Sequence, residues 1–104
     1  MKNIINYKDF GKKLNELLSE LPAEINDKDV DKEILRMGII AELDAINLYE
    51  QFATKTKNNK LKELLLDIAK EEKTHIGEFQ SFLLTLDEEF GKELKNGEKE
   101  FKKL

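Results

Sequence analysis

The sequence has no cysteine, one proline and one histidine among its 104 residues. The absence of cysteine excludes disulfide scaffolds, thiolate metal sites and cysteine catalysis. Because His75 is the only histidine, a single chain cannot build a three-histidine zinc site. One proline and five glycines are few for a loop-rich or all-β protein. What remains is a small helical protein with the length of one domain.

The sequence also lacks strong charge of one sign and long apolar runs. It has 18 basic and 22 acidic residues, a net charge of −4, and no basic cluster that would bind nucleic acid. Residues 1–7 are too polar for a signal peptide, which needs about seven consecutive apolar residues. The uncharged runs, such as Met37–Ala41, are far below the roughly 18 residues that span a membrane. We therefore expect a cytoplasmic protein with no nucleic-acid or membrane partner.

Apolar residues recur at helical spacing in three successive segments. The pattern predicts a short amphipathic helix over residues 8–21, stopped by Pro22. Two long helices are predicted over residues 31–57 and 60–86. The pair Asn58–Asn59 between them is predicted to form the turn, because asparagine tolerates left-handed φ.

These segments predict an all-α fold with three parts. Residues 1–30 form an N-terminal amphipathic helix and a linker, in which Asp29 or Asp31 is available to cap the next helix. Residues 31–87 form an antiparallel helical hairpin. Residues 88–104 form a marginal helix or a tail, which Asp87 can cap and which its two glycines weaken.

Three ionisable side chains interrupt the apolar stripes of the two long helices. The stripes consist of Leu35, Gly38, Glu42, Ala45, Tyr49 and Phe52 in the first helix and of Leu61, Leu64, Ile68, Glu72, His75, Phe79, Phe82 and Leu86 in the second. Glu42 and His75 lie equally far from the turn, at roughly 25 Å along their helices. Glu72 shares a helix face with His75 and lies about 4.5 Å nearer the turn. The three side chains are therefore predicted to converge.

A carboxylate on such a stripe needs a partner, because an unpaired buried charge costs several kcal/mol. Two carboxylates and one imidazole suit a divalent first-row metal, with iron or manganese preferred to zinc. The spacing Glu-x-x-His is weak by itself, since fifteen glutamates make it a chance event in roughly one of seven such chains. Taken singly, each residue is more often a satisfied core histidine or a rim carboxylate. Their conjunction favours a metal site.

Three aromatic residues of the stripes receive separate interpretations. Tyr49 lies two turns after Glu42 and is a further candidate site residue, although a tyrosine at such a position is more often ordinary core. Phe79 and Phe82 are expected to serve packing.

The predicted ligand set is half of a known pattern. Ferritin-like di-metal bundles use one Glu from each of two helices and one Glu-x-x-His from each of the other two. One copy of this chain supplies half of these groups, and a two-fold dimer would supply all of them. A two-helix hairpin also cannot bury its apolar stripes alone. We therefore expect a dimer that closes a four-helix bundle around a di-metal site.

Two segments resemble the encapsulated ferritin family, whose members are joined to or travel with encapsulin shells. They are residues 39–50 (IIAELDAINLYE) and residues 71–79 (EEKTHIGEF), and the resemblance extends over about residues 33–90. It implies a ring of ten chains, built from five dimers, that oxidises Fe(II) with dioxygen. By this resemblance Glu42, Glu72 and His75 are the iron ligands, with one iron per chain, and Tyr49 lies beside the site. The iron is then passed to the interior of an encapsulin nanocompartment in the cytoplasm for storage.

The sequence departs from this family at two places. Some members carry acidic residues just before and two after the first ligand, where this chain has Ala41 and Asp44, so an outer metal-entry site is in doubt. The last residues, Glu100–Leu104, do not resemble a shell-targeting peptide. Three hypotheses follow from the sequence: a ferroxidase, a rubrerythrin-like protein that scavenges peroxide, and a non-enzymatic helical scaffold.

Overall fold

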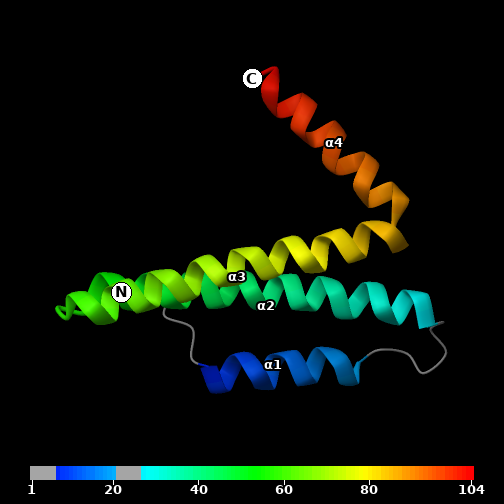
Figure 1. Ribbon diagram of the computed structural model, residues 1–104. Coiled ribbons are helices and arrows are strands. Elements are labelled where there is room, and N and C mark those ends of the chain that lie inside the picture. The colour runs from blue at the N-terminus through cyan, green and yellow to red at the C-terminus, as the bar shows by residue number, and fades with distance from the viewer. Residues whose placement is uncertain (1–6, 21–26) are drawn as a thin grey trace.

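The computed structural model describes residues 7–20 and 27–104, which form four helices and no strand. The helices are α1 (Tyr7–Ser19), α2 (Asp27–Lys55), α3 (Asn59–Leu86) and α4 (Glu88–Lys102). In Figure 1, α2 and α3 form a long antiparallel hairpin, α1 runs alongside α2, and α4 points away from the end of α3. The predicted all-α fold class is confirmed. None of the described helices is long and apolar enough to cross a membrane.

The turn between α2 and α3 spans residues 56–58, so it includes the predicted Asn58, whereas Asn59 is the first residue of α3. Asn58 has φ −87° and ψ 113°, and none of the described residues has a positive φ. The side chain of Asn58 instead accepts a hydrogen bond from the Leu61 backbone N–H at 3.1 Å and so acts as the N-cap of α3. The backbone N–H of Asn58 donates to Thr56 Oγ1 at 3.1 Å. The prediction that an asparagine adopts left-handed φ in this turn is therefore wrong, and Asn58 instead caps α3.

The N-terminal boundaries also differ from those predicted. Helix α2 begins at Asp27, four residues before the predicted start, so Asp29 and Asp31 lie inside the helix and do not cap it. Asp27 and Asp29 lie in its first turn, where carboxylates favour the helix dipole. Helix α1 ends at Ser19, and the predicted stop at Pro22 lies outside the described residues.

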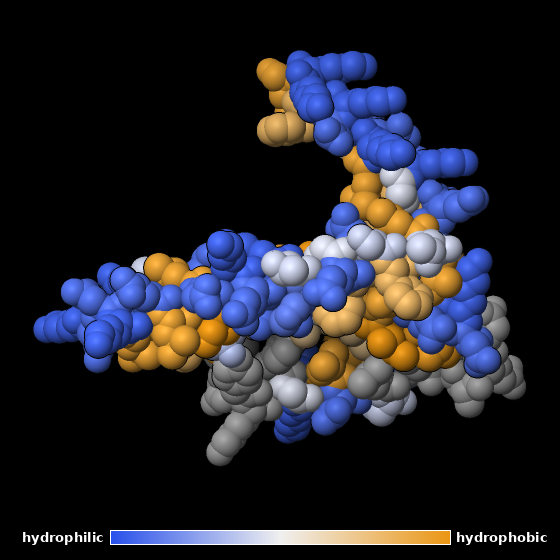
Figure 2. Space-filling model, viewed as in Figure 1, coloured by the Kyte–Doolittle hydropathy of each residue, from blue (hydrophilic) through white to orange (hydrophobic). Residues whose placement is uncertain are grey.

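The residues that fill the hairpin are mostly not those of the two predicted stripes. The fully buried side chain of α3 is Leu83, and Ala53 and Ala69 are buried as well. Ile46 is also buried, whereas Phe82, which was expected to pack, is 59% exposed. The stripes instead leave apolar residues open on the hairpin surface, part of which is visible in Figure 2.

Helix α1 covers another face of α2. Leu14 and Leu17 of α1 and Met37 and Ile40 of α2 line a small apolar pocket of about 30 Å³ together with Lys13 and Asp44. Met37 is buried at this contact. The acidic residue left at the doubtful entry site, Asp44, thus lies beside α1.

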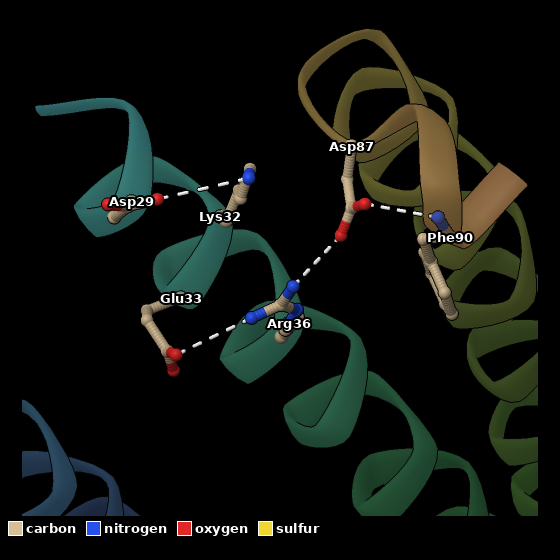
Figure 3. A network of polar contacts seen from close by, with 6 residues as sticks. All are labelled: Asp29, Lys32, Glu33, Arg36, Asp87 and Phe90. Atoms are coloured by element: carbon tan, nitrogen blue, oxygen red, sulfur yellow. Dashed lines mark hydrogen bonds and ion pairs between the residues drawn. The ribbon is translucent and has the colours of Figure 1, made fainter.

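A polar network fixes the corner between α3 and α4 (Figure 3). Asp87 caps α4, as predicted, by accepting a hydrogen bond from the Phe90 backbone N–H at 3.0 Å. Its other carboxylate oxygen accepts from Arg36 Nη2 of α2 at 2.9 Å. Arg36 also pairs with Glu33 at 3.4 Å. The hydrogen bond from Phe90 lowers the pKa of Asp87 below its usual value, with a smaller contribution from Arg36.

Helix α4 is a complete helix and not a marginal one. It continues through both glycines to Lys102, and its last turn carries Lys99 and Lys102, which favour the helix dipole. None of its residues is buried. Apart from the Asp87 corner, α4 touches α3 at its first turn, where the Cα of Gly91 faces Leu84.

Candidate metal centre

The structure brings Glu42, Glu72 and His75 together. One ligand atom from each residue can be chosen so that all three atoms lie within 4.8 Å of one another. His75 Nδ1 lies 3.4 Å from Glu72 Oε2 and 3.6 Å from Glu42 Oε2. Both separations are long for a hydrogen bond, so the carboxylates are close to the imidazole without being tied to it.

The hairpin register places these groups. Glu42 projects from α2, whereas Glu72 and His75 project from one face of α3 at a spacing of three residues. Glu42 and His75 are equally distant in sequence from the midpoint between Asn58 and Asn59, so antiparallel packing brings them to one level. The three-residue connection between α2 and α3 leaves little room for a shift of this register.

The two carboxylates are largely withdrawn from water, while the histidine is not. The side chains of Glu42 and Glu72 are 17% and 19% exposed, and that of His75 is 46% exposed. The group therefore lies at the surface of the single chain, with its acidic side facing the hairpin and its imidazole edge open.

Charge and hydrogen bonding at this group fit a cation. Glu42 Oε2 is buried and has no hydrogen-bond partner. An unsatisfied buried acceptor costs about 1–3 kcal/mol, and more if it is charged. Among the described residues, neither Glu42 nor Glu72 pairs with a lysine or arginine; Lys73, beside Glu72, pairs with Glu50 at 3.2 Å. A bound divalent metal ion would satisfy the carboxylate oxygen and balance the charge.

Tyr49 is the fourth predicted site residue. It lies on the same face of α2 as Glu42 but seven residues further on, which is about 10 Å along the helix axis. Its side chain is half-buried. Its place beside the site stays a prediction.

One contact next to the donors was not found from the sequence. A methyl group on Gly38 would lie only 3.3 Å from Cε2 of Phe79, so the ring packs directly on the backbone of α2. Both residues belong to the predicted stripes, but their spacing alone does not predict that they touch. The antiparallel register could have indicated this contact, because Gly38 precedes Glu42 by four residues and Phe79 follows His75 by four, which places them at one level.

Comparisons with known proteins give a consistent result. Residues 33–103 match the family described as Rubrerythrin. The chain is 53% identical, over 93 residues, to a ferritin-like-encapsulin shell fusion protein of Pyrococcus furiosus, a match that covers 85% of this chain and 27% of that protein. It is 36% identical, over 75 residues, to the encapsulin nanocompartment cargo protein EncC of Myxococcus xanthus, covering 72% of this chain and 57% of that protein.

A solved structure resembles most of the helical arrangement. The crystal structure of the encapsulated ferritin domain from Pyrococcus furiosus matches with a TM-score of 0.74 and 48% sequence identity. The match covers 83% of this chain and 89% of that domain. The chain therefore spans nearly all of that domain but only about a quarter of the fusion protein.

Proposed function

The chain belongs to the encapsulated ferritin family of rubrerythrin-like proteins, and on this premise we propose that it is a ferroxidase. It oxidises Fe(II) to Fe(III) with dioxygen as the electron acceptor. This proposal rests on the group of Glu42, Glu72 and His75, in which the buried Oε2 of Glu42 has no hydrogen-bond partner.

Glu42, Glu72 and His75 hold the iron in this proposal. The oxygen-rich donor set favours iron or manganese over zinc. Iron held by these three residues would supply one-electron redox chemistry. The chain contributes anionic carboxylates that stabilise Fe(III), the more highly charged product.

We propose that the complete site forms between two copies of the chain. Each copy supplies one Glu and one Glu-x-x-His, and the ferritin-like di-metal pattern needs two of each. Apolar side chains of the interrupted stripes, with exposures from 37% to 59%, accompany the donors in the single chain; they are Phe52, Leu61, Leu64 and Phe82. Burying them in an isologous interface would supply a hydrophobic driving force for a four-helix bundle. The proposed content is one iron per chain.

The higher assembly and the partner are proposals as well. The names of the two relatives, a shell fusion and a nanocompartment cargo protein, support association with an encapsulin shell protein. We propose that the chain works inside an encapsulin nanocompartment in the cytoplasm, as a ring of five dimers, and delivers Fe(III) there for storage. The chain spans 27% and 57% of these two relatives, so the activity of the whole proteins is extended to it by proposal only.

The activity test compares two adjacent glutamates. Glu72→Ala removes one donor of the group, whereas Glu71→Ala removes an exposed glutamate next to it. We expect Glu72→Ala to abolish rapid Fe(II) oxidation, followed by the absorbance of Fe(III), and Glu71→Ala to leave the rate unchanged. Rapid oxidation by Glu72→Ala would contradict the proposal.

The interface test is native mass spectrometry with Fe(II) added under anaerobic conditions. One iron per chain, found only in dimers or larger species, is the expected result, because each chain holds half of the donors. Oligomers that do not respond to iron would instead support the scaffold hypothesis.

A second candidate function is peroxide reduction, which the match to the Rubrerythrin family favours. The absence of cysteine weighs against it, since rubrerythrins usually add a cysteine-ligated iron. Comparing the rates with hydrogen peroxide and with dioxygen decides between the two. A strong preference for peroxide would replace the ferroxidase proposal.

A further inference from the structure

Gly38 is an unusual residue for the middle of a long helix. Glycine inside a helix costs roughly 0.5–1 kcal/mol relative to alanine, so a close neighbour is a sufficient reason for it. That neighbour is Phe79 of α3, three of whose ring carbons would lie 3.3–3.4 Å from a methyl group on Gly38. The missing side chain lets the phenylalanine ring rest on the α2 backbone.

This contact lies one helical turn from the metal donors. Gly38 precedes Glu42 by four residues and Phe79 follows His75 by four, so the step along each helix axis is about 6 Å. The donors come from two helices, and the separation between Glu42 and His75 therefore depends on how closely α2 and α3 approach at this level.

We propose that Gly38 and Phe79 are positioning residues that set the spacing of α2 and α3 at the metal centre. The inference rests on the proposed metal-binding function of Glu42, Glu72 and His75. The ring acts as a spacer of fixed thickness, and the glycine lets it seat on the opposite backbone. A methyl group on Gly38 requires the ring to give way by a few tenths of an ångström. If α3 moves with the ring, the distance between the carboxylate of Glu42 and the donors of α3 increases and metal binding weakens.

The surroundings of the ring define the competing outcome. Gly38 and Phe79 also border an open apolar hollow of about 370 Å³ with Leu14, Ile34 and Met37. If the ring swings into this hollow, α2 and α3 keep their spacing and a methyl group on Gly38 has no effect on the donors. The experiment distinguishes a ring that moves alone from a ring that moves the helix.

The test measures binding of Co²⁺ to the full chain by its visible absorption, which reports the affinity and the ligand geometry without any turnover. We expect Gly38→Ala to bind Co²⁺ about tenfold more weakly, as is typical when a supporting residue around a metal site is changed. Its absorption spectrum should differ from that of the wild type. The matched control is Gly77→Ala in α3, because a methyl group there meets nothing within 4 Å. It should bind as the wild type does.

Phe79→Leu provides the second arm and remains informative if Gly38→Ala does not fold. Alone, it removes the spacer and should also weaken Co²⁺ binding. Combined with Gly38→Ala, it leaves room for the methyl group and should recover most of the lost affinity, which is the signature of coupled neighbours. Wild-type affinity and spectrum in Gly38→Ala, or in Phe79→Leu if the first variant is unfolded, would overturn the inference. A wild-type chain that fails to bind Co²⁺ or Fe²⁺ would instead overturn the proposed function.

Discussion

The α2–α3 hairpin and helix α4 are both well-formed helical regions, but different interactions hold them. The hairpin has a buried interior that includes Leu83, Ala69 and Ala53. Helix α4 has no buried residue, points away from the hairpin in Figure 1 and leaves its apolar side chains visible in Figure 2. Its interactions with the rest of the described chain are confined to its first turn.

This difference separates two sources of helix stability. Packing of an apolar face supplies most of the stability of helices in proteins, and the hairpin has it. Helix α4 relies on local terms: the Asp87 cap, acidic residues in the first turn and basic residues in the last. We therefore expect α4 to open locally without unfolding the hairpin.

The largest effect is expected from the hairpin interior. Leu83→Ala should lower the free energy of unfolding by about 2–5 kcal/mol, since it leaves a cavity at a fully buried position. The matched change in α4 is Phe101→Ala, because the Phe101 side chain is 71% exposed. This change should alter the free energy of unfolding by less than about 0.5 kcal/mol. Denaturant unfolding of the metal-free chain measures both. Equal losses would mean that packing holds α4 as firmly as the hairpin.

A smaller and local effect is expected at the corner. Asp87→Asn removes the charge that Arg36 and the Phe90 N–H stabilise, so amide hydrogens of α4 should exchange faster while those of α2 and α3 keep their rates. Hydrogen exchange followed by NMR measures this change. The control is Lys102→Gln, which breaks the exposed Lys102–Glu98 pair inside α4 and leaves the corner intact. Faster exchange throughout the hairpin in Asp87→Asn would show that the two regions unfold together.

The pH dependence of α4 sharpens the same comparison. The Phe90 hydrogen bond lowers the pKa of Asp87 in the folded chain. The ionised Asp87 carboxylate therefore contributes fully to the stability of α4 above the ordinary pKa of 3.8. This contribution is lost as the pH falls through the lowered pKa. Protection of α4 amides should therefore decrease in this acidic range in the wild type, and the decrease should be smaller in Asp87→Asn. The same decrease in both proteins would assign it to other carboxylates.

The smallest effect is expected from a glycine in α4. Gly97→Ala should stabilise α4 by roughly 0.5–1 kcal/mol, because a methyl group there meets nothing within 4 Å and alanine favours the helix. Circular dichroism of thermal unfolding should show a gain confined to the earliest part of the transition. If the stability of α4 did not increase, interactions other than local helix propensity would determine it.

The sequence predicted the features that depend on local chemistry and periodicity. The hairpin and the convergence of Glu42 with Glu72 and His75 follow from helical spacing counted from one short turn. The Asp87 cap follows from the preference for aspartate at the N-terminus of a helix. The early start of α2 was missed because its first turn carries acidic residues without apolar periodicity. Helix α4 is longer and more regular than its two glycines suggest, because it has an N-cap and charges at both ends that favour the helix dipole.

The remaining features depend on which residues meet in space. The Arg36–Asp87 contact joins positions 51 residues apart, and nothing in one sequence marks that pair. The contact of Gly38 with Phe79 obeys the register, but the closeness of the ring to the backbone appears only in three dimensions. The stripes were read correctly as apolar faces, yet several of their side chains lie on the outside of a single hairpin.

The short connection between α2 and α3 has a consequence for the order of folding. Contacts next to the Asn58 turn close small loops, whereas the Glu42–His75 level closes a loop of about 33 residues and the Arg36–Asp87 corner a longer one. We expect the contacts between α2 and α3 to form progressively from the turn outward, since local contacts form first. Glu42, Glu72 and His75 then meet only after roughly half of the hairpin has closed, so a nascent chain does not assemble the proposed metal site before that stage.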